Sequence, residues 1–121
     1  MSSNEVLKLI KDKEIDYVDL RFTDPRGKLQ HLTMDKTVVD GDMLNEGVFF
    51  DGSSIAGWKA INESDMILKP DLTRKIIDPY TSHNTLVLFC DILDAVKKNP
   101  YERDPRGIAK KAEAYLKSTG I

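Results

Sequence analysis

Residues 49–58 hold most of the side chains in this sequence that could do chemistry. They place a carboxylate, two hydroxyl groups, two glycines and the only tryptophan directly after two phenylalanines, in the order Phe49-Phe50-Asp51-Gly52-Ser53-Ser54-Ile55-Ala56-Gly57-Trp58. Aromatic residues beside a polar, glycine-containing segment indicate a loop that is anchored by hydrophobic side chains and exposed to a ligand. Glycine after Asp51 permits close backbone approach or a positive φ. The local alternative is an Asx turn at Asp51, with serine side chains capping nearby amides.

The acidic residues are unevenly distributed around this stretch. Between residues 41 and 71 there are six acidic residues and two lysines, namely Asp42, Glu46, Asp51, Glu63, Asp65 and Asp71 against Lys59 and Lys69. This balance favours a bound cation over an anion, and the alternative is a solvated acidic face. The whole chain has 18 basic and 20 acidic residues and no block of like charge, which argues against a nucleic-acid partner or an anionic membrane surface.

Other reactive residues form no recognisable site. His31 and His83 have no histidine or cysteine at metal-ligand spacing, so we expect no metal site within this chain. The chain lacks a phosphate-binding glycine motif. Cys90 lies in an apolar run, where we expect a buried, unreactive thiol. There is no apolar signal region and no apolar run long enough to cross a membrane, so we expect a cytoplasmic protein.

The amino-terminal third predicts a helix followed by a β-hairpin. Ser2 and Glu5 have capping-box spacing before an amphipathic helix over residues 3–13. Residues 15–23 alternate with period two, as a half-buried strand does. The sequence Asp24-Pro25-Arg26-Gly27 fits a type I turn, and a second alternating strand follows it.

The rest of the chain predicts short strands and a terminal helix. One helical turn fits residues 42–46, and strands fit residues 66–68 and 74–77 on either side of a turn at Pro70-Asp71. A continuous apolar run at residues 85–92 predicts a central strand that is buried on both faces. Asp104 and Pro105 suit the start of a helix whose apolar face would comprise Ile108, Ala112, Tyr115 and Leu116. This helix either packs on the preceding strands or opens a domain that the chain lacks.

The amino-acid sequences of several segments resemble those of one known family. The long segment Phe50 to Asp71, including Gly57-Trp58-Lys59 and Pro70-Asp71, resembles the amino-terminal domain of bacterial type I glutamine synthetase, and so do the stretches Val18 to Asp24, Leu88 to Ile92 and Arg103 to Arg106. The resemblance implies an α+β fold of the β-grasp (ubiquitin-like) type, with a mixed sheet, a short N-terminal helix and a C-terminal helix. It also implies that the chain is a fragment, with a β-grasp domain at residues 1–102 and the opening helix of an absent catalytic domain at 103–121.

The resemblance further implies an enzyme that makes glutamine from glutamate, ammonia and ATP through a γ-glutamyl phosphate. ATP and Mg²⁺ or Mn²⁺ would bind in the full-length enzyme and not in this fragment, which would be inactive alone. The enzyme would be a homo-oligomer of two stacked hexameric rings. Asp51 would face the ammonium site of the neighbouring subunit and Ser54 would support it by hydrogen bonding, while the loop itself would be supported by Gly52, Ser53 and Trp58.

A function of another class remains open from the sequence. The chain could be a free-standing β-grasp module that binds a partner without catalysis. The native reading frame distinguishes the two, because continuation beyond Ile121 into a catalytic domain excludes the module.

Overall fold

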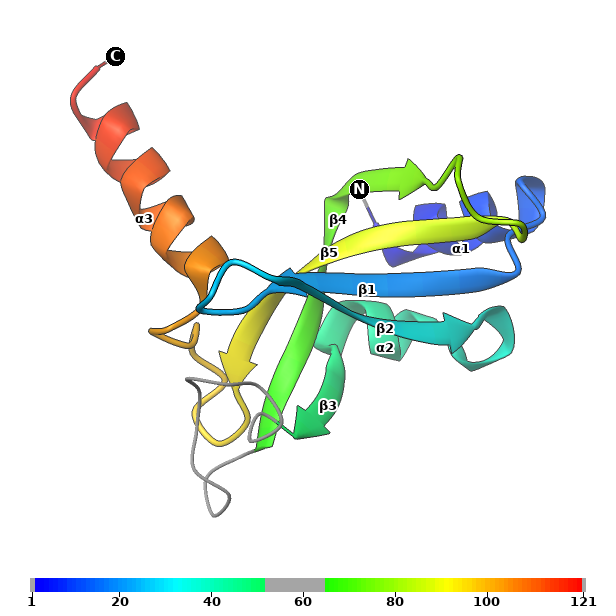
Figure 1. The fold of residues 1–121 in the computed structure, drawn as a ribbon, viewed down its shortest axis with the longest axis horizontal. Helices are drawn as coiled ribbons and strands as arrows, with labels where there is room; N and C mark the ends of the chain where they lie inside the picture. The colour runs from blue at the N-terminus through cyan, green and yellow to red at the C-terminus, as the bar shows by residue number, and fades with distance from the viewer. Residues whose placement is uncertain (1, 52–64, 121) are drawn as a thin grey trace.

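The computed structural model describes residues 2–51 and 65–120. These residues form a mixed sheet in the order β2-β1-β5-β4-β3, in which β1 and β5 are parallel and the other neighbours are antiparallel (Figure 1). In chain order the elements are α1 (Ser3–Asp12), β1 (Tyr17–Thr23), β2 (Leu29–Asp35), the 3-10 helix η1 (Lys36–Val38), α2 (Gly41–Glu46), β3 (Val48–Asp51), β4 (Asp65–Ile77), β5 (Thr85–Asp94) and α3 (Pro105–Ser118).

The first helix and the hairpin confirm the predictions from the sequence. The Ser2 side chain caps α1 by accepting a hydrogen bond from the Glu5 amide at 3.3 Å. In the hairpin turn, the Gly27 amide donates to the Asp24 carbonyl at 3.0 Å, and Gly27 has a φ of +85°. The Asp24 carboxylate accepts from the amides of Arg26 and Lys28, so one side chain organises the whole turn.

The central strand is β5, as the apolar run predicts. Leu86 and Leu88 are fully buried on one face, and Val87 between them is 1% exposed on the other. Cys90 is also buried, and burial raises the pKa of its thiol, which keeps the sulfur protonated and unreactive.

The predicted break at Pro70-Asp71 is wrong. Residues 65–77 form one strand, β4, which contains a register shift between Pro70 and Lys75. Proline has no amide hydrogen to donate, so an irregularity in the strand accommodates it without ending the strand. The register shift moves Asp71 out of regular strand pairing, which is the effect that the sequence suggested for a turn.

Strand β3 is absent from the sequence-based predictions. It has four residues and pairs with β4 at the edge of the sheet. Gly47 immediately before it has a φ of +91°, and a Cβ atom there would lie 2.5 Å from the Leu68 carbonyl oxygen. Only glycine fits this close approach, which brings β3 alongside β4.

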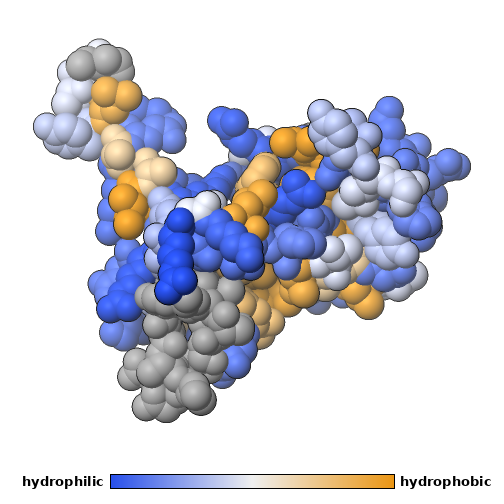
Figure 2. All heavy atoms as spheres, viewed as in Figure 1, coloured by the Kyte–Doolittle hydropathy of each residue, from blue (hydrophilic) through white to orange (hydrophobic). Residues whose placement is uncertain are grey.

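One face of the sheet carries the core, and the other is largely uncovered. Helices α1 and α2 lie behind the sheet in the view of Figure 1. Side chains of these helices such as Val6, Ile10 and Leu44 belong to the same hydrophobic cluster as those of β1, β4 and β5. Helix α3 begins beside β1 and β5 and then points away from the sheet (Figure 1). It has no buried residue, and Ile108 and Tyr115 are 56% and 72% exposed. Figure 2 shows hydrophobic residues at the surface along this helix.

Candidate functional site

Asp51, the main candidate from the sequence, lies at the end of edge strand β3. Its side chain is exposed, and it is paired across the ladder with Asp65, the first residue of β4. Directly opposite residues of an antiparallel pair share a face, where two like charges repel. The end of this strand pair therefore places two carboxylates on one face of the sheet.

The two phenylalanines before Asp51 have different environments. The Phe50 ring packs against Phe22, with a centroid distance of 5.4 Å, so it ties β3 to the core as the sequence predicts. Phe49 is 68% exposed and does not anchor the segment. The alternation of β3 explains this difference, because successive side chains point to opposite faces.

The other predicted site residues lie outside the described part of the chain. Gly52, Ser53, Ser54 and Trp58 all belong to residues 52–64. Their roles, and their arrangement around Asp51, stay predictions.

A polar network on the uncovered face of the sheet was missed by the sequence analysis. Asp19 is 4% exposed, and its carboxylate accepts hydrogen bonds from Arg21 Nε at 2.8 Å and Thr33 Oγ1 at 3.0 Å. His31 Nδ1 lies 2.9 Å from the same carboxylate, and Arg21 also donates to Asp78 at 3.0 Å. Alternating positions on the two predicted strands were the available signal, because they place these residues on one face.

The network holds its central carboxylate in the charged form. Burial by itself would raise the pKa of Asp19, but hydrogen bonds from Arg21, His31 and Thr33 outweigh it and lower the pKa. The Thr33 hydroxyl is engaged as a donor to the carboxylate, so the arrangement does not contain an activated nucleophile. We interpret the network as a structural clamp between β1, β2 and Asp78, which directly follows β4.

Within residues 2–51 and 65–120, no three histidine, cysteine, aspartate or glutamate side chains come together as a metal site. His31 lies against Asp19, and the His83 ring packs edge-on against Tyr17 with a centroid distance of 5.6 Å. In the same ranges, no helix is both long enough and apolar enough to cross a membrane.

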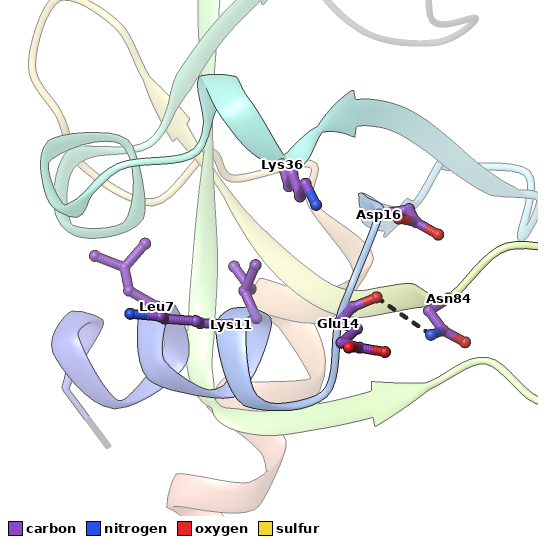
Figure 3. Close-up of a pocket in the computed structure, with 7 residues that line it drawn as sticks. Leu7, Lys11, Glu14, Asp16, Lys36 and Asn84 are labelled. Carbon is purple, nitrogen blue, oxygen red and sulfur yellow. Dashed lines mark hydrogen bonds between the residues drawn. The ribbon is translucent and has the colours of Figure 1, made fainter.

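A pocket of about 600 Å³ lies between α1, the segment after it and η1 (Figure 3). Its lining combines two ammonium groups, two carboxylates, an amide and two aliphatic side chains, contributed by Lys11, Lys36, Glu14, Asp16, Asn84, Leu7 and Ile10. The Asn84 side chain donates to the Glu14 carbonyl at 3.2 Å, which closes one side (Figure 3). These lining residues do not include a site residue predicted from the sequence.

Residues 14–95 match the family described as "Glutamine synthetase, beta-Grasp domain". The chain belongs to this family. The match spans more than half of the chain and runs from just after α1 through β5, so it confirms both the resemblance and the predicted α+β fold of β-grasp type. Helix α3 lies beyond the matched segment.

Known glutamine synthetases are similar to the whole chain. The enzyme of Rhizobium meliloti is 63% identical over 120 residues, covering 99% of this chain and 26% of the relative. That of Methylococcus capsulatus is 57% identical over 121 residues, covering 100% of this chain and 26% of the relative. The structure of Plasmodium falciparum glutamine synthetase superposes with a TM-score of 0.87 at 27% identity, covering 100% of this chain and 23% of that one. The β-grasp chain thus spans about a quarter of the length of the curated relatives it matches.

Proposed function

We propose that this chain is the amino-terminal part of a glutamine synthetase, which makes glutamine from glutamate, ammonia and ATP through a γ-glutamyl phosphate. The observation that carries the proposal is the 63% identity to the Rhizobium meliloti enzyme across 99% of the chain. Because the chain spans about a quarter of that relative, we assign the activity to the full-length protein. The 121 residues alone should form no glutamine.

Within that enzyme, Asp51 would bind ammonium and accept a proton from it, so that neutral ammonia attacks the acyl phosphate. Its exposed carboxylate at the end of β3, opposite Asp65, supports a cation site. A positioned base of this kind contributes about 10²–10⁴-fold to a rate. Ser54 would hydrogen-bond within the site, and Gly52, Ser53 and Trp58 would hold the loop.

Within residues 2–51 and 65–120, no group of three histidine, cysteine, aspartate or glutamate side chains could hold a metal ion. In the full-length enzyme, ATP and Mg²⁺ or Mn²⁺ would bind outside this chain. The metal would supply charge neutralisation for the transferred phosphoryl group.

The assembly that we propose is a homo-oligomer of two stacked hexameric rings in the cytoplasm, without a nucleic-acid or membrane partner. Each β-grasp domain would lend Asp51 to the site of the neighbouring subunit. We place the domain boundary between residues 102 and 103. Helix α3 has no buried residue, which supports this boundary because the helix shares little of the core of the sheet.

The test uses the full-length protein with Asp51→Asn, which removes the charge and keeps the shape. We expect kcat/KM for ammonium to fall by about 100-fold or more, while the Kd for ATP is unchanged. Asp42→Asn is the matched control, because this exposed carboxylate on α2 belongs to the same acidic segment. Unchanged turnover in Asp51→Asn would refute the role of Asp51. Absence of glutamine formation by the unmodified full-length protein would refute the synthetase.

A further inference from the structure

Two motifs that are far apart in the sequence meet at the start of α3. Pro70-Asp71 lies in β4, and Arg103 to Arg106 lead into the helix. The Arg106 guanidinium donates through Nη2 to Asp71 and through Nη1 to Asp91 on β5, at 3.1 Å for the second contact. One side chain of α3 therefore bridges two neighbouring strands.

Asp104 ties the same helix end to the backbone of the sheet. It is 2% exposed, and one carboxylate oxygen accepts from the Ile92 amide on β5 at 3.1 Å. The other oxygen accepts from the Arg106 amide at 3.1 Å, as a helix cap does. Because both oxygens are used, a single carboxylate sets the distance between β5 and the first turn of α3.

The irregularity in β4 places the partner of Arg106. Asp71 lies within the register shift between Pro70 and Lys75, where its carboxylate also accepts from the Thr73 amide at 3.0 Å. On β5, Asp91 accepts from Lys110 Nζ at 2.7 Å, one turn further along α3 than Arg106. Three carboxylates thus surround the start of the helix, where its dipole favours negative charge.

The remainder of α3 has a different character. The residues of α3 are all at least partly exposed, and near its far end Lys117 pairs with Glu113 of the same helix at 3.2 Å. Such a contact within one helix stabilises the helix but does not fix its direction relative to the sheet. We name the group Asp71, Asp91, Asp104, Arg106 and Lys110 the α3 anchor.

We propose that Arg106 and Asp104 are positioning residues, which fix the direction of α3 relative to the sheet through the α3 anchor. In the full-length protein, the anchor would set where Asp51 lies relative to the part of the enzyme that follows α3. This consequence for catalysis rests on the proposed function, whereas the fixed direction of α3 does not.

The direction of α3 is measured in the 121-residue chain by the distance between two spin labels. Lys8→Cys on α1 and Ala114→Cys on α3 provide exposed labelling positions, and the buried Cys90 stays unlabelled. The unmodified anchor should give one narrow distance distribution. Arg106→Gln should broaden the distribution and shift its mean, whereas Lys117→Gln, the matched control on the same helix, should leave it unchanged.

A second variant removes the same contact from the strand. Asp71→Asn should reproduce the broadening, so the result does not depend on Arg106→Gln folding well. A distribution as narrow as that of the unmodified chain in both variants would overturn the proposal.

The full-length protein tests the catalytic consequence separately. Arg106→Gln should lower kcat/KM for ammonium by about 10-fold or more, because small misplacements of reacting groups are costly, and leave the Kd for ATP unchanged. Arg106→Lys should recover part of the loss, since it restores the charge. Full activity in Arg106→Gln would overturn the consequence for catalysis. A full-length protein without synthetase activity would refute the proposed function and leave the spin-label result standing.

Discussion

Strand β5 and helix α3 follow each other in the chain, yet different forces hold them. The side chains of β5 that face the core, such as Leu86 and Leu88, are fully buried among apolar neighbours, so the strand is held by the removal of apolar surface from water. Helix α3 is exposed beyond its first turn and is fixed at that turn by hydrogen bonds and ion pairs. The domain should therefore be stable through its sheet, while the direction of α3 should respond to single polar substitutions.

The largest difference between β5 and α3 should be in the free energy of unfolding, when a core side chain is truncated. Leu88→Ala removes a fully buried side chain from β5 and should lower the free energy of unfolding by about 3 kcal/mol. Leu116→Ala on α3 is the matched control and should cost far less, since this side chain is 49% exposed. Urea denaturation measures both. Equal losses would mean that α3 is buried in the folded chain, which contradicts the comparison.

An intermediate effect should come from the junction between the regions. Asp104→Ala removes the helix cap and leaves the buried Ile92 amide without its acceptor, at a combined cost of about 2 kcal/mol. Asp35→Ala provides the control, because Asp35 caps the short helix η1 in an exposed position. Thermal unfolding followed by circular dichroism compares the two variants. If Asp104→Ala loses no more stability than Asp35→Ala, the junction between β5 and α3 contributes little to the stability of the fold.

The smallest effect should be a pH dependence of folding stability, which arises from the Asp19 network on the uncovered face of the sheet. Although burial opposes it, hydrogen bonding by Arg21, His31 and Thr33 lowers the pKa of Asp19. A lowered pKa in the folded state stabilises the fold above the unfolded value of about 3.9, and this contribution is lost as pH falls through the folded pKa. Stability should thus decline in acid, and Asp19→Asn should make the decline shallower. An identical acid slope in Asp19→Asn would contradict the clamp that we assign to this network.

Local chemistry accounts for the elements that the sequence predicted well. The cap at Ser2, the turn at Asp24 and the cap at Asp104 each depend on neighbours within four residues. The central position of β5 was also predictable, because its continuous apolar run is typical of a central strand. For the candidate site, the exposed position of Asp51 agrees with a polar residue beside a glycine.

Contacts between distant residues account for what the sequence did not predict. The pairing of β3 with β4 depends on the approach of Gly47 to Leu68, and the α3 anchor joins residues that are 35 positions apart. Neither contact produces a periodic pattern in the amino-acid sequence. The sequence marked Pro70 as a break because proline commonly ends strands, whereas the sheet accommodates it in a register shift.

The most direct test of the central claim compares two nucleophiles in the full-length enzyme carrying Asp51→Asn. Ammonium must lose a proton before it attacks the acyl phosphate, whereas hydroxylamine is uncharged at neutral pH and needs no base. We predict that kcat/KM falls by about 100-fold or more with ammonium and far less with hydroxylamine. Equal losses with the two nucleophiles would contradict the assignment of Asp51 as the group that binds and deprotonates ammonium.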